Sequence, residues 1–147
     1  VREKRGLAYY IKTAAERFHE TGHLVTQAGV DVGKIEEAIK VILTEYQKIA
    51  NSQGRIANGE LKEAKEYLKG RLILALEDSY AVAALYGESE LLENKISLPL
   101  QVMTGIEKVT LADLSRVAKT IFLPKNLNLA IIGPYKQRTR FAKILKL

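Results

Sequence analysis

The sequence has no cysteine, no tryptophan, two histidines and three prolines in 147 residues. It also lacks any apolar run near the roughly 20 residues that cross a bilayer, so no membrane partner is expected. The absence of cysteine excludes disulfides, thiolate metal ligands and a cysteine nucleophile, and it fits a reducing compartment such as the cytoplasm. No leader typical of a signal peptide opens the chain. We therefore predict a cytoplasmic protein, and the start without Met suggests a piece of a longer one.

The charged residues give a basic balance without a nucleic-acid signature. Lys and Arg number 23 against 17 Asp and Glu, a net charge of +6, and both signs are interleaved along the helical stretches, as on a solvated surface. The only local excess lies at the end of the chain: Lys136, Arg138, Arg140, Lys143 and Lys146. We expect the nearby Tyr135 and Phe141 to face the core rather than to stack on bases, so nucleic acid is not an expected partner.

The first third of the chain predicts two extended segments followed by a long helix. Gly6 is a candidate helix C′ residue, after which residues 7–18 alternate as a strand and residues 24–30 form a second one. Asp31 is a good N-cap for a helix that runs to residue 50. Apolar residues at steps of three and four predict the buried face of this helix: Ile35, Ala38, Ile39, Ile42, Leu43, Tyr46 and Ile49.

The rest of the chain predicts mostly helix. Residues 60–93 form a long helical region that breaks near Asp78 or Ser79, which could cap a new helix, and Gly70 inside it suggests close packing against the sheet. Further helices are expected at 99–108, at 111–122 and over the last residues, 136–147. The segment 126–134, with its apolar and β-branched run, is the best strand candidate of the sequence. We predict one α+β domain over residues 1–147.

The stretch His19-Glu20-Thr21-Gly22-His23 matches H-E-x-x-H, a pattern of zinc peptidases. In such enzymes the two histidines lie one helical turn apart, so that both imidazoles reach one metal. Against this, Thr21-Gly22 is poor in helix propensity, Gly22 alone costing about 1 kcal/mol. The flanking segments also fit extended structure, in which Glu20 to Gly22 form a hairpin turn. An independent zinc protease that uses His19, Glu20 and His23 stays open as an alternative.

A second motif lies upstream. The segment Arg2-Glu3-Lys4-Arg5-Gly6-Leu7-Ala8-Tyr9 closely resembles the "L-R-E-K-R-G-L-A-Y" segment in the C-terminal half of pitrilysin/insulinase-type zinc metallopeptidases, the family of the mitochondrial processing peptidase. The similarity continues through Ala28–Asp31, through Glu60–Leu92 with its "AK-x-x-LKG" segment, and through Lys108–Pro134. The resemblance implies an α+β fold in which an antiparallel-rich sheet packs against several long helices, with the first strands of the domain absent from this chain.

The resemblance also implies where the chemistry lies. Members of this family hold zinc with H-x-x-E-H in their N-terminal half, and no H-x-x-E-H occurs in this chain. Zinc is thus expected in the intact enzyme but outside this chain, with no metal ligand here, and "HETGH" becomes a loop between two strands. The family pairs an Arg with a Tyr seven residues later, which are Arg2 and Tyr9 here. Both are implied to hydrogen-bond the bound peptide near its scissile carbonyl. The alternative is a solvated Arg2 and a core Tyr9.

The resemblance therefore predicts the substrate-binding C-terminal part of a zinc endopeptidase, inactive alone. Its expected partners are a peptide substrate and a zinc-bearing N-terminal half or partner subunit, and we expect a dimer. A non-catalytic structural or presenting subunit of the same family is the first alternative.

Overall fold

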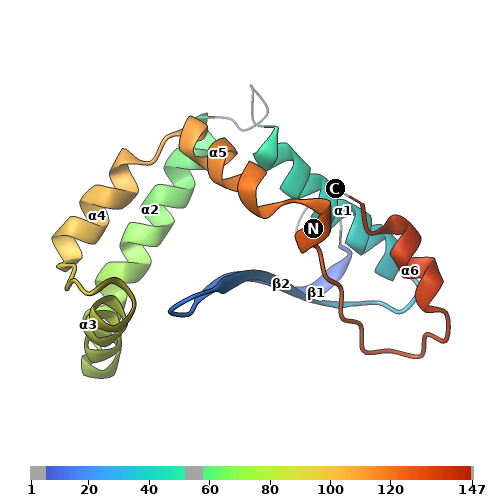
Figure 1. Ribbon diagram of the computed structural model, residues 1–147, viewed down its shortest axis with the longest axis horizontal. Helices are drawn as coiled ribbons and strands as arrows, with labels where there is room; N and C mark the ends of the chain where they lie inside the picture. The colour runs from blue at the N-terminus through green and yellow to red at the C-terminus, as the bar shows by residue number, and fades with distance from the viewer. Residues whose placement is uncertain (1–5, 52–57, 147) are drawn as a thin grey trace. The chain divides into compact units, whose positions relative to one another are not determined.

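The computed structural model describes residues 6–51 and 58–146 (Figure 1). Its elements follow in this order: β1 Ala8–Arg17, β2 Gly22–Val30, α1 Ile35–Ala50, α2 Asn58–Ala75, α3 Ser79–Glu93, α4 Pro99–Lys108, α5 Leu111–Ile121, the 3-10 turn η1 Pro124–Asn126 and α6 Arg138–Ile144. The chain divides into two compact units. Unit 1 comprises residues 1–15, 24–55 and 112–147, and unit 2 comprises residues 16–23 and 56–111.

Strands β1 and β2 form a two-stranded antiparallel hairpin, as their alternation predicts. Thr13 and Thr26 face each other across it, with their hydroxyls 2.7 Å apart. In the same register, the Tyr10 ring lies over Gly29, where an added Cβ would come within 2.3 Å of it. Tyr46 of α1 donates its hydroxyl hydrogen to Thr26. The hairpin is thus joined to the helix that follows it.

The core of unit 1 forms where α1 meets the hairpin and α6. Its main cluster consists of Ile35, Ile39, Leu43 and Phe141, all less than 9% exposed. Helices α1 and α6 lie side by side (Figure 1), because the apolar stripe of α1 needs cover on more than the hairpin side. The Tyr46 ring also stacks on Phe122, with centroids 4.4 Å apart. The stripe predicted for α1 and the inward placement of Phe141 are confirmed.

The predicted start of α1 is wrong by several residues. The helix begins at Ile35, and its N-cap is Lys34, which makes no side-chain cap. The Asp31 carboxylate instead accepts a hydrogen bond from the Gly33 amide at 2.8 Å. Asp31 therefore closes a local turn before the helix, since short acidic side chains satisfy turn amides as readily as helix caps.

The strand predicted at 126–134 is also wrong: the segment has no partner strand among the described residues. Leu127 and Ile131 pack on the core of unit 1, whereas Ile132 is fully exposed. Inward-facing and exposed side chains are therefore both present along this segment, as they are along a strand. A strand also needs a neighbouring backbone to bond to, and the described part of the chain offers none at this place.

Unit 2 contains α2, α3 and α4. The break between α2 and α3 is confirmed, and Asp78 caps α3 by accepting a hydrogen bond from the Tyr80 amide at 2.9 Å. Ser89 is the buried polar residue of this unit; its hydroxyl donates to the Lys95 carbonyl at 2.6 Å and accepts from the Ser97 amide at 3.1 Å. These bonds fix the connection from α3 to α4.

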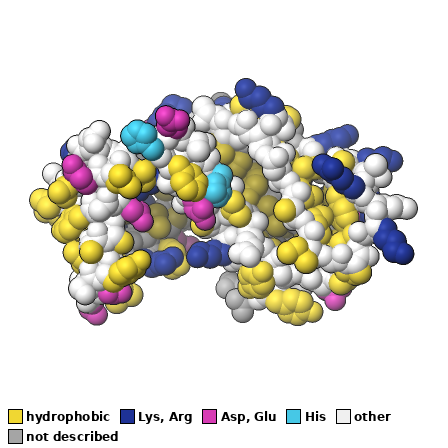
Figure 2. All heavy atoms as spheres, turned by 60° about the horizontal axis from the view of Figure 1, so that its bottom comes forward, with side chains coloured by type: hydrophobic (Ala, Val, Ile, Leu, Met, Phe, Trp, Pro, Cys, Tyr) yellow, Lys and Arg dark blue, Asp and Glu magenta, His cyan; other side chains and the backbone are white. Residues whose placement is uncertain are grey.

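Many apolar side chains of unit 2 stay exposed, and Figure 2 shows hydrophobic side chains at the surface of one face of the molecule. Leu74, Leu91 and Leu100 are each between 68% and 72% exposed. Among the described residues, no helix combines the length and the apolar character needed to cross a membrane.

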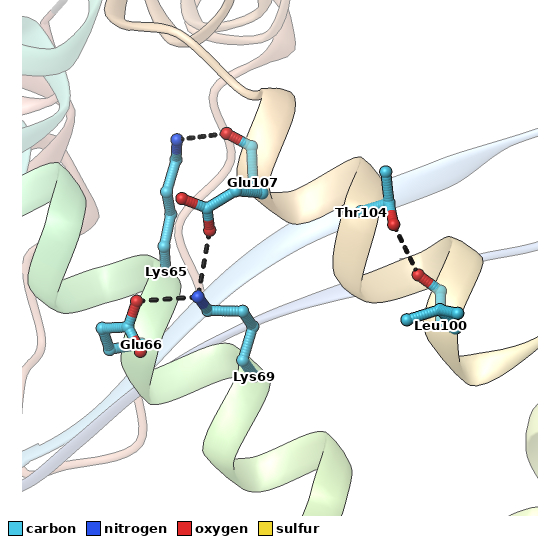
Figure 3. Close-up of polar contacts among 6 residues, drawn as sticks. All are labelled: Lys65, Glu66, Lys69, Leu100, Thr104 and Glu107. Atoms are coloured by element: carbon cyan, nitrogen blue, oxygen red, sulfur yellow. Dashed lines mark hydrogen bonds and ion pairs between the residues drawn. The ribbon is translucent and has the colours of Figure 1, made fainter.

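Polar contacts join α2 to α4, which lie side by side (Figure 1). Lys69 Nζ lies 2.7 Å from Glu66 Oε1 on its own helix and 3.0 Å from Glu107 Oε2 on α4 (Figure 3). One turn earlier, Lys65 Nζ donates to the Glu107 carbonyl oxygen at 2.6 Å (Figure 3). Glu107 thus accepts hydrogen bonds from two lysines, one at its carboxylate and one at its backbone carbonyl. These two bonds set the position of α4 along the axis of α2.

These elements confirm an α+β fold in which a small antiparallel sheet accompanies several helices. The packing predicted for Gly70 is wrong, because a Cβ added there would meet nothing within 4 Å. The single-domain organisation over residues 1–147 stays a prediction.

Candidate functional site

Of the two predicted site residues, Tyr9 lies within the described part of the chain and Arg2 lies outside it. Tyr9 is the second residue of β1, and its side chain is 73% exposed. Strand alternation places it on the opposite face from Tyr10, whose ring covers Gly29. Within the described residues, Tyr9 is therefore not part of a buried core, and its role stays a prediction.

The chain just before Tyr9 is held firmly. Gly6 has a φ of +57°, in the left-handed region that favours glycine. Leu7 is only 4% exposed and packs with Ala38 and Val41 of α1. Leu7 thus anchors the start of β1 on α1, so that Tyr9 projects from a fixed strand end.

The two histidines of "HETGH" lie in a hairpin and not in a helix. His19 and Glu20 form the bend between the strands, closed by a hydrogen bond from the Phe18 amide to the Thr21 carbonyl at 2.8 Å. His23 is the second residue of β2. The helical spacing on which an H-E-x-x-H zinc site depends is therefore absent, and the predicted hairpin turn is confirmed, one residue nearer the N-terminus than expected.

The side chains around this turn have other partners. His23 Nε2 lies 3.2 Å from Glu16 Oε2 directly across the hairpin, and its ring lies 5.7 Å from the Phe18 ring. Glycine is required at position 22, because a Cβ there would come within 2.8 Å of the Glu16 carbonyl oxygen. No group of three or more His, Cys, Asp or Glu side chains within residues 6–51 and 58–146 could hold a metal. The residues of this turn thus do not fit a zinc site.

Sequence reasoning missed the cluster of Lys65, Lys69 and Glu107. The hydrogen bonds that Lys69 donates to Glu66 and Glu107 raise the pKa of Lys69 above its ordinary value. The hydrogen bond from Lys69 lowers the pKa of Glu107. The Glu66–Lys69 spacing of three residues is visible in the sequence, but Glu107 lies 38 residues beyond Lys69 and only the tertiary structure brings it there. The cluster acts as a structural contact between α2 and α4.

Comparison with known proteins relates the whole chain to peptidases. No family model matches it. The chain is 30% identical over all 147 residues to an uncharacterized zinc protease of Mycobacterium leprae, of which it covers 32%. It is 26% identical over 125 residues, 84% of the chain and 28% of the relative, to a probable inactive metalloprotease of Bacillus subtilis.

The beta subunit of the mitochondrial-processing peptidase of Lentinula edodes is 27% identical over 99 residues, 67% of the chain and 21% of that subunit. The chain thus spans about a third or less of the curated relatives it matches. Among solved structures, a conserved protein from Enterococcus faecalis V583 superimposes with a TM-score of 0.67 and 30% identity, over 80% of this chain and 27% of that one.

Proposed function

Because this chain belongs to the pitrilysin/insulinase-type zinc metallopeptidases, we propose that it is the substrate-binding part of a zinc endopeptidase. In this proposal Arg2 and Tyr9 face a zinc site that another part of the protein or a partner subunit holds. The observation that carries it is the placement of Tyr9, whose phenol is 73% exposed on a strand end anchored by the buried Leu7.

The chemistry follows from what the two side chains can donate. The zinc, outside this chain, would supply the activated water. As that water attacks the scissile peptide, the carbonyl oxygen gains negative charge, and a phenol O–H and a guanidinium are suitable donors to it. Tyr9 contributes a fixed donor because β1 positions its backbone. Arg2 adds a positive charge that also holds the peptide before the reaction.

The proposal extends to partners and location. The catalytic unit needs a zinc-bearing half or partner subunit, and the exposed apolar side chains of this chain, such as Leu100 and Ile132, suit an interface with it or with a second copy. A cytoplasmic location is also proposed, from the lack of cysteine. Cell fractionation with an antibody to the chain tests the location.

Tyr9→Phe in the intact zinc-containing protein is the test of the catalytic role. The substitution removes one hydrogen-bond donor and keeps the ring, so kcat for a peptide substrate should fall by roughly 10²–10³-fold, about 2.7–4 kcal/mol, with little change in KM. Tyr10→Phe, whose ring covers Gly29 on the opposite face, is the matched control and should keep kcat within about twofold. Equal kcat values for the wild type and Tyr9→Phe would contradict the proposal.

A non-catalytic subunit is the second candidate, favoured by the relative that is named a probable inactive metalloprotease. The two candidates differ in one measurement. If the assembled protein binds peptide with the same Kd before and after Tyr9→Phe and hydrolyses none, the chain serves a presenting subunit. If hydrolysis occurs and depends on Tyr9, it serves an enzyme.

A further inference from the structure

A chain of three hydroxyl groups joins α1 to both strands of the hairpin. Tyr46 of α1 donates its hydroxyl hydrogen to the Thr26 hydroxyl on β2, and the Thr26 and Thr13 hydroxyl oxygens lie 2.7 Å apart across the two strands. Because Thr26 accepts from Tyr46, its own hydrogen is available to Thr13. This hydroxyl chain, Tyr46–Thr26–Thr13, runs from the helix through β2 to β1, the strand that carries Tyr9.

Tyr46 is the fixed end of the hydroxyl chain. Its ring packs against the main apolar cluster of unit 1 and stacks on the Phe122 ring, with centroids 4.4 Å apart. These contacts hold the ring in one orientation, so its hydroxyl points in one direction. A partly buried phenol needs a hydrogen-bond partner, and Thr26 supplies it. The hydroxyl chain therefore starts from a side chain that is itself held in place.

The register of the hairpin places Tyr9 on the same face as the hydroxyl chain. Thr13 lies opposite Thr26, and Tyr10 lies opposite Gly29, so the pairing is continuous along the strands. Tyr9 and Thr13 are four positions apart, and residues an even number apart share a face of a strand. A slip of one residue between the strands would turn Tyr9 to the other face. The direction of the Tyr9 phenol thus depends on the register that the hydroxyl chain joins to α1.

The apolar contacts between the hairpin and α1 do not supply the same restraint. Leu7 packs with Ala38 and Val41, and Val30 packs against both apolar clusters of unit 1. Apolar contact is non-directional, so these side chains tolerate small shifts along the helix. A hydrogen bond weakens steeply when its geometry changes. The hydroxyl chain therefore adds a directional restraint on β1 that the apolar contacts lack.

We propose that Tyr46, acting through Thr26 and Thr13, is a positioning residue for Tyr9. In this role it makes no contact with the peptide. It holds β1 so that the Tyr9 hydroxyl lies where the scissile carbonyl oxygen gains its charge. A donor displaced by about 1 Å can lose about 10²-fold in rate. This inference rests on the role proposed for Tyr9 and extends it to the helix that fixes the strand.

The test is peptide hydrolysis by the intact zinc-containing protein that carries Thr26→Val, which removes the hydroxyl and keeps a β-branched side chain. We expect kcat to fall by about tenfold or more with KM within about twofold, because the peptide still binds but Tyr9 is displaced. Thr26→Ser keeps a hydroxyl and should keep kcat within about twofold of the wild type. A normal kcat in Thr26→Val, or an equal loss in Thr26→Ser, overturns the proposal.

A double-mutant cycle separates positioning from an independent effect on the rate. Tyr46→Phe removes the donor of the hydroxyl chain and keeps the ring that stacks on Phe122. It should lower kcat as Thr26→Val does. In a protein that already carries Tyr9→Phe it should lower kcat no further, because residues that act as a unit are not additive. A fall by the same factor in both backgrounds means that Tyr46 acts independently of Tyr9 and overturns the proposal.

Ser115→Ala is the control for the loss of a structural hydroxyl. Ser115 of α5 donates to the Ala50 carbonyl oxygen at the end of α1 at 2.9 Å, a bond that does not involve the hairpin. This variant should keep kcat within about twofold. Hydrogen exchange of the amides of residues 8–13 should be faster in Thr26→Val than in Ser115→Ala. Equal losses of kcat, or equal exchange in β1, indicate a general effect on stability and overturn the proposal.

Failure of this inference and failure of the proposed function give different results. If the intact protein hydrolyses no peptide, or if Tyr9→Phe leaves kcat unchanged, both are wrong. If Tyr9→Phe lowers kcat while Thr26→Val and Tyr46→Phe do not, the proposed function stands and the role of the hydroxyl chain is wrong.

Discussion

Glu107 of α4 accepts a hydrogen bond from Lys69 of α2 at 3.0 Å (Figure 3). The same glutamate uses its backbone carbonyl to accept from Lys65 at 2.6 Å. Helices α2 and α4 expose many of their apolar side chains and contribute no residue to the buried core of the described chain. Their mutual position therefore depends on polar contacts to an unusual degree, and it should respond to pH and salt.

The Lys69–Glu107 pair predicts a stability that is lost at both pH extremes. The pKa of Glu107 is lowered in the folded chain, so its contribution is present above the unfolded pKa and disappears as the pH falls through the folded pKa. The pKa of Lys69 is raised, so its contribution is present below the unfolded value of 10.5 and disappears as the pH rises through the folded pKa. Urea unfolding across the acid range measures the first loss.

Glu107→Gln should flatten that acid dependence, because the glutamine side chain carries no charge to lose. Glu63→Gln on α2 is the matched control, since Glu63 is exposed and makes no ion pair in the described chain; it should leave the dependence as in the wild type. If the free energy of unfolding depends on pH in the same way in both variants, the Lys69–Glu107 pair is not the cause of the acid dependence. In high salt the effect of Glu107→Gln should shrink, as for any exposed pair.

Kinetics of two further variants of the intact enzyme should show whether activity depends on the proposed Arg2–Tyr9 pair or on the histidines of the hairpin turn. Arg2→Ala should lower kcat/KM, with part of the loss in KM, because a charged donor also holds the peptide before reaction. His19→Ala should keep kcat and KM within about threefold and leave the zinc content unchanged, because His19 lies in a hairpin bend that cannot present a helical ligand pair. An inactive, zinc-free His19→Ala enzyme would restore the alternative of an independent zinc protease.

The exposed apolar surface predicts that the chain associates with itself when no partner is present. Ile132 is fully exposed on a segment that has no strand partner among the described residues, so Ile132→Asp should shift the molecular mass toward the monomer. Ala83→Asp, at an exposed position of α3, is the control and should leave the mass unchanged. Light scattering during dilution measures both, and a wild-type monomer at all concentrations would contradict the prediction.

Two glycines should respond in opposite directions to alanine. Gly70→Ala in α2 should raise the free energy of unfolding by up to about 1 kcal/mol, because the added Cβ meets nothing and glycine is a poor helix former. Gly29→Ala should lower it, because the Cβ would lie 2.3 Å from the Tyr10 ring and push it away. Thermal unfolding gives both signs, and a destabilised Gly70→Ala would mean that α2 is packed at that position.

Local patterns predicted those features that depend on neighbours in the sequence. The alternation of 7–18 and 24–30 predicted the hairpin, and the Asp78 cap predicted the break between α2 and α3. The segment 126–134 shows the limit of such reasoning. Its alternating apolar residues are those of a strand, but pairing is a property of two segments, and no partner lies beside it in the described chain.

The candidate site divides in the same way. The sequence alone showed the seven-residue spacing of Arg2 and Tyr9, which resembles the pattern of the family. It also showed the poor helix propensity of Thr21-Gly22, which argues against a helical zinc site at "HETGH". That Tyr9 is exposed while Leu7 is buried could not be read from the alternation, because it depends on where α1 covers the hairpin. The sequence by itself thus determined the helices, the hairpin and the residues proposed for the site, Arg2 and Tyr9. Only the tertiary structure decided which of them meet, as Glu107 meets Lys69 and Tyr135 meets Val32, because those contacts join residues 38 and 103 positions apart that no local interaction relates.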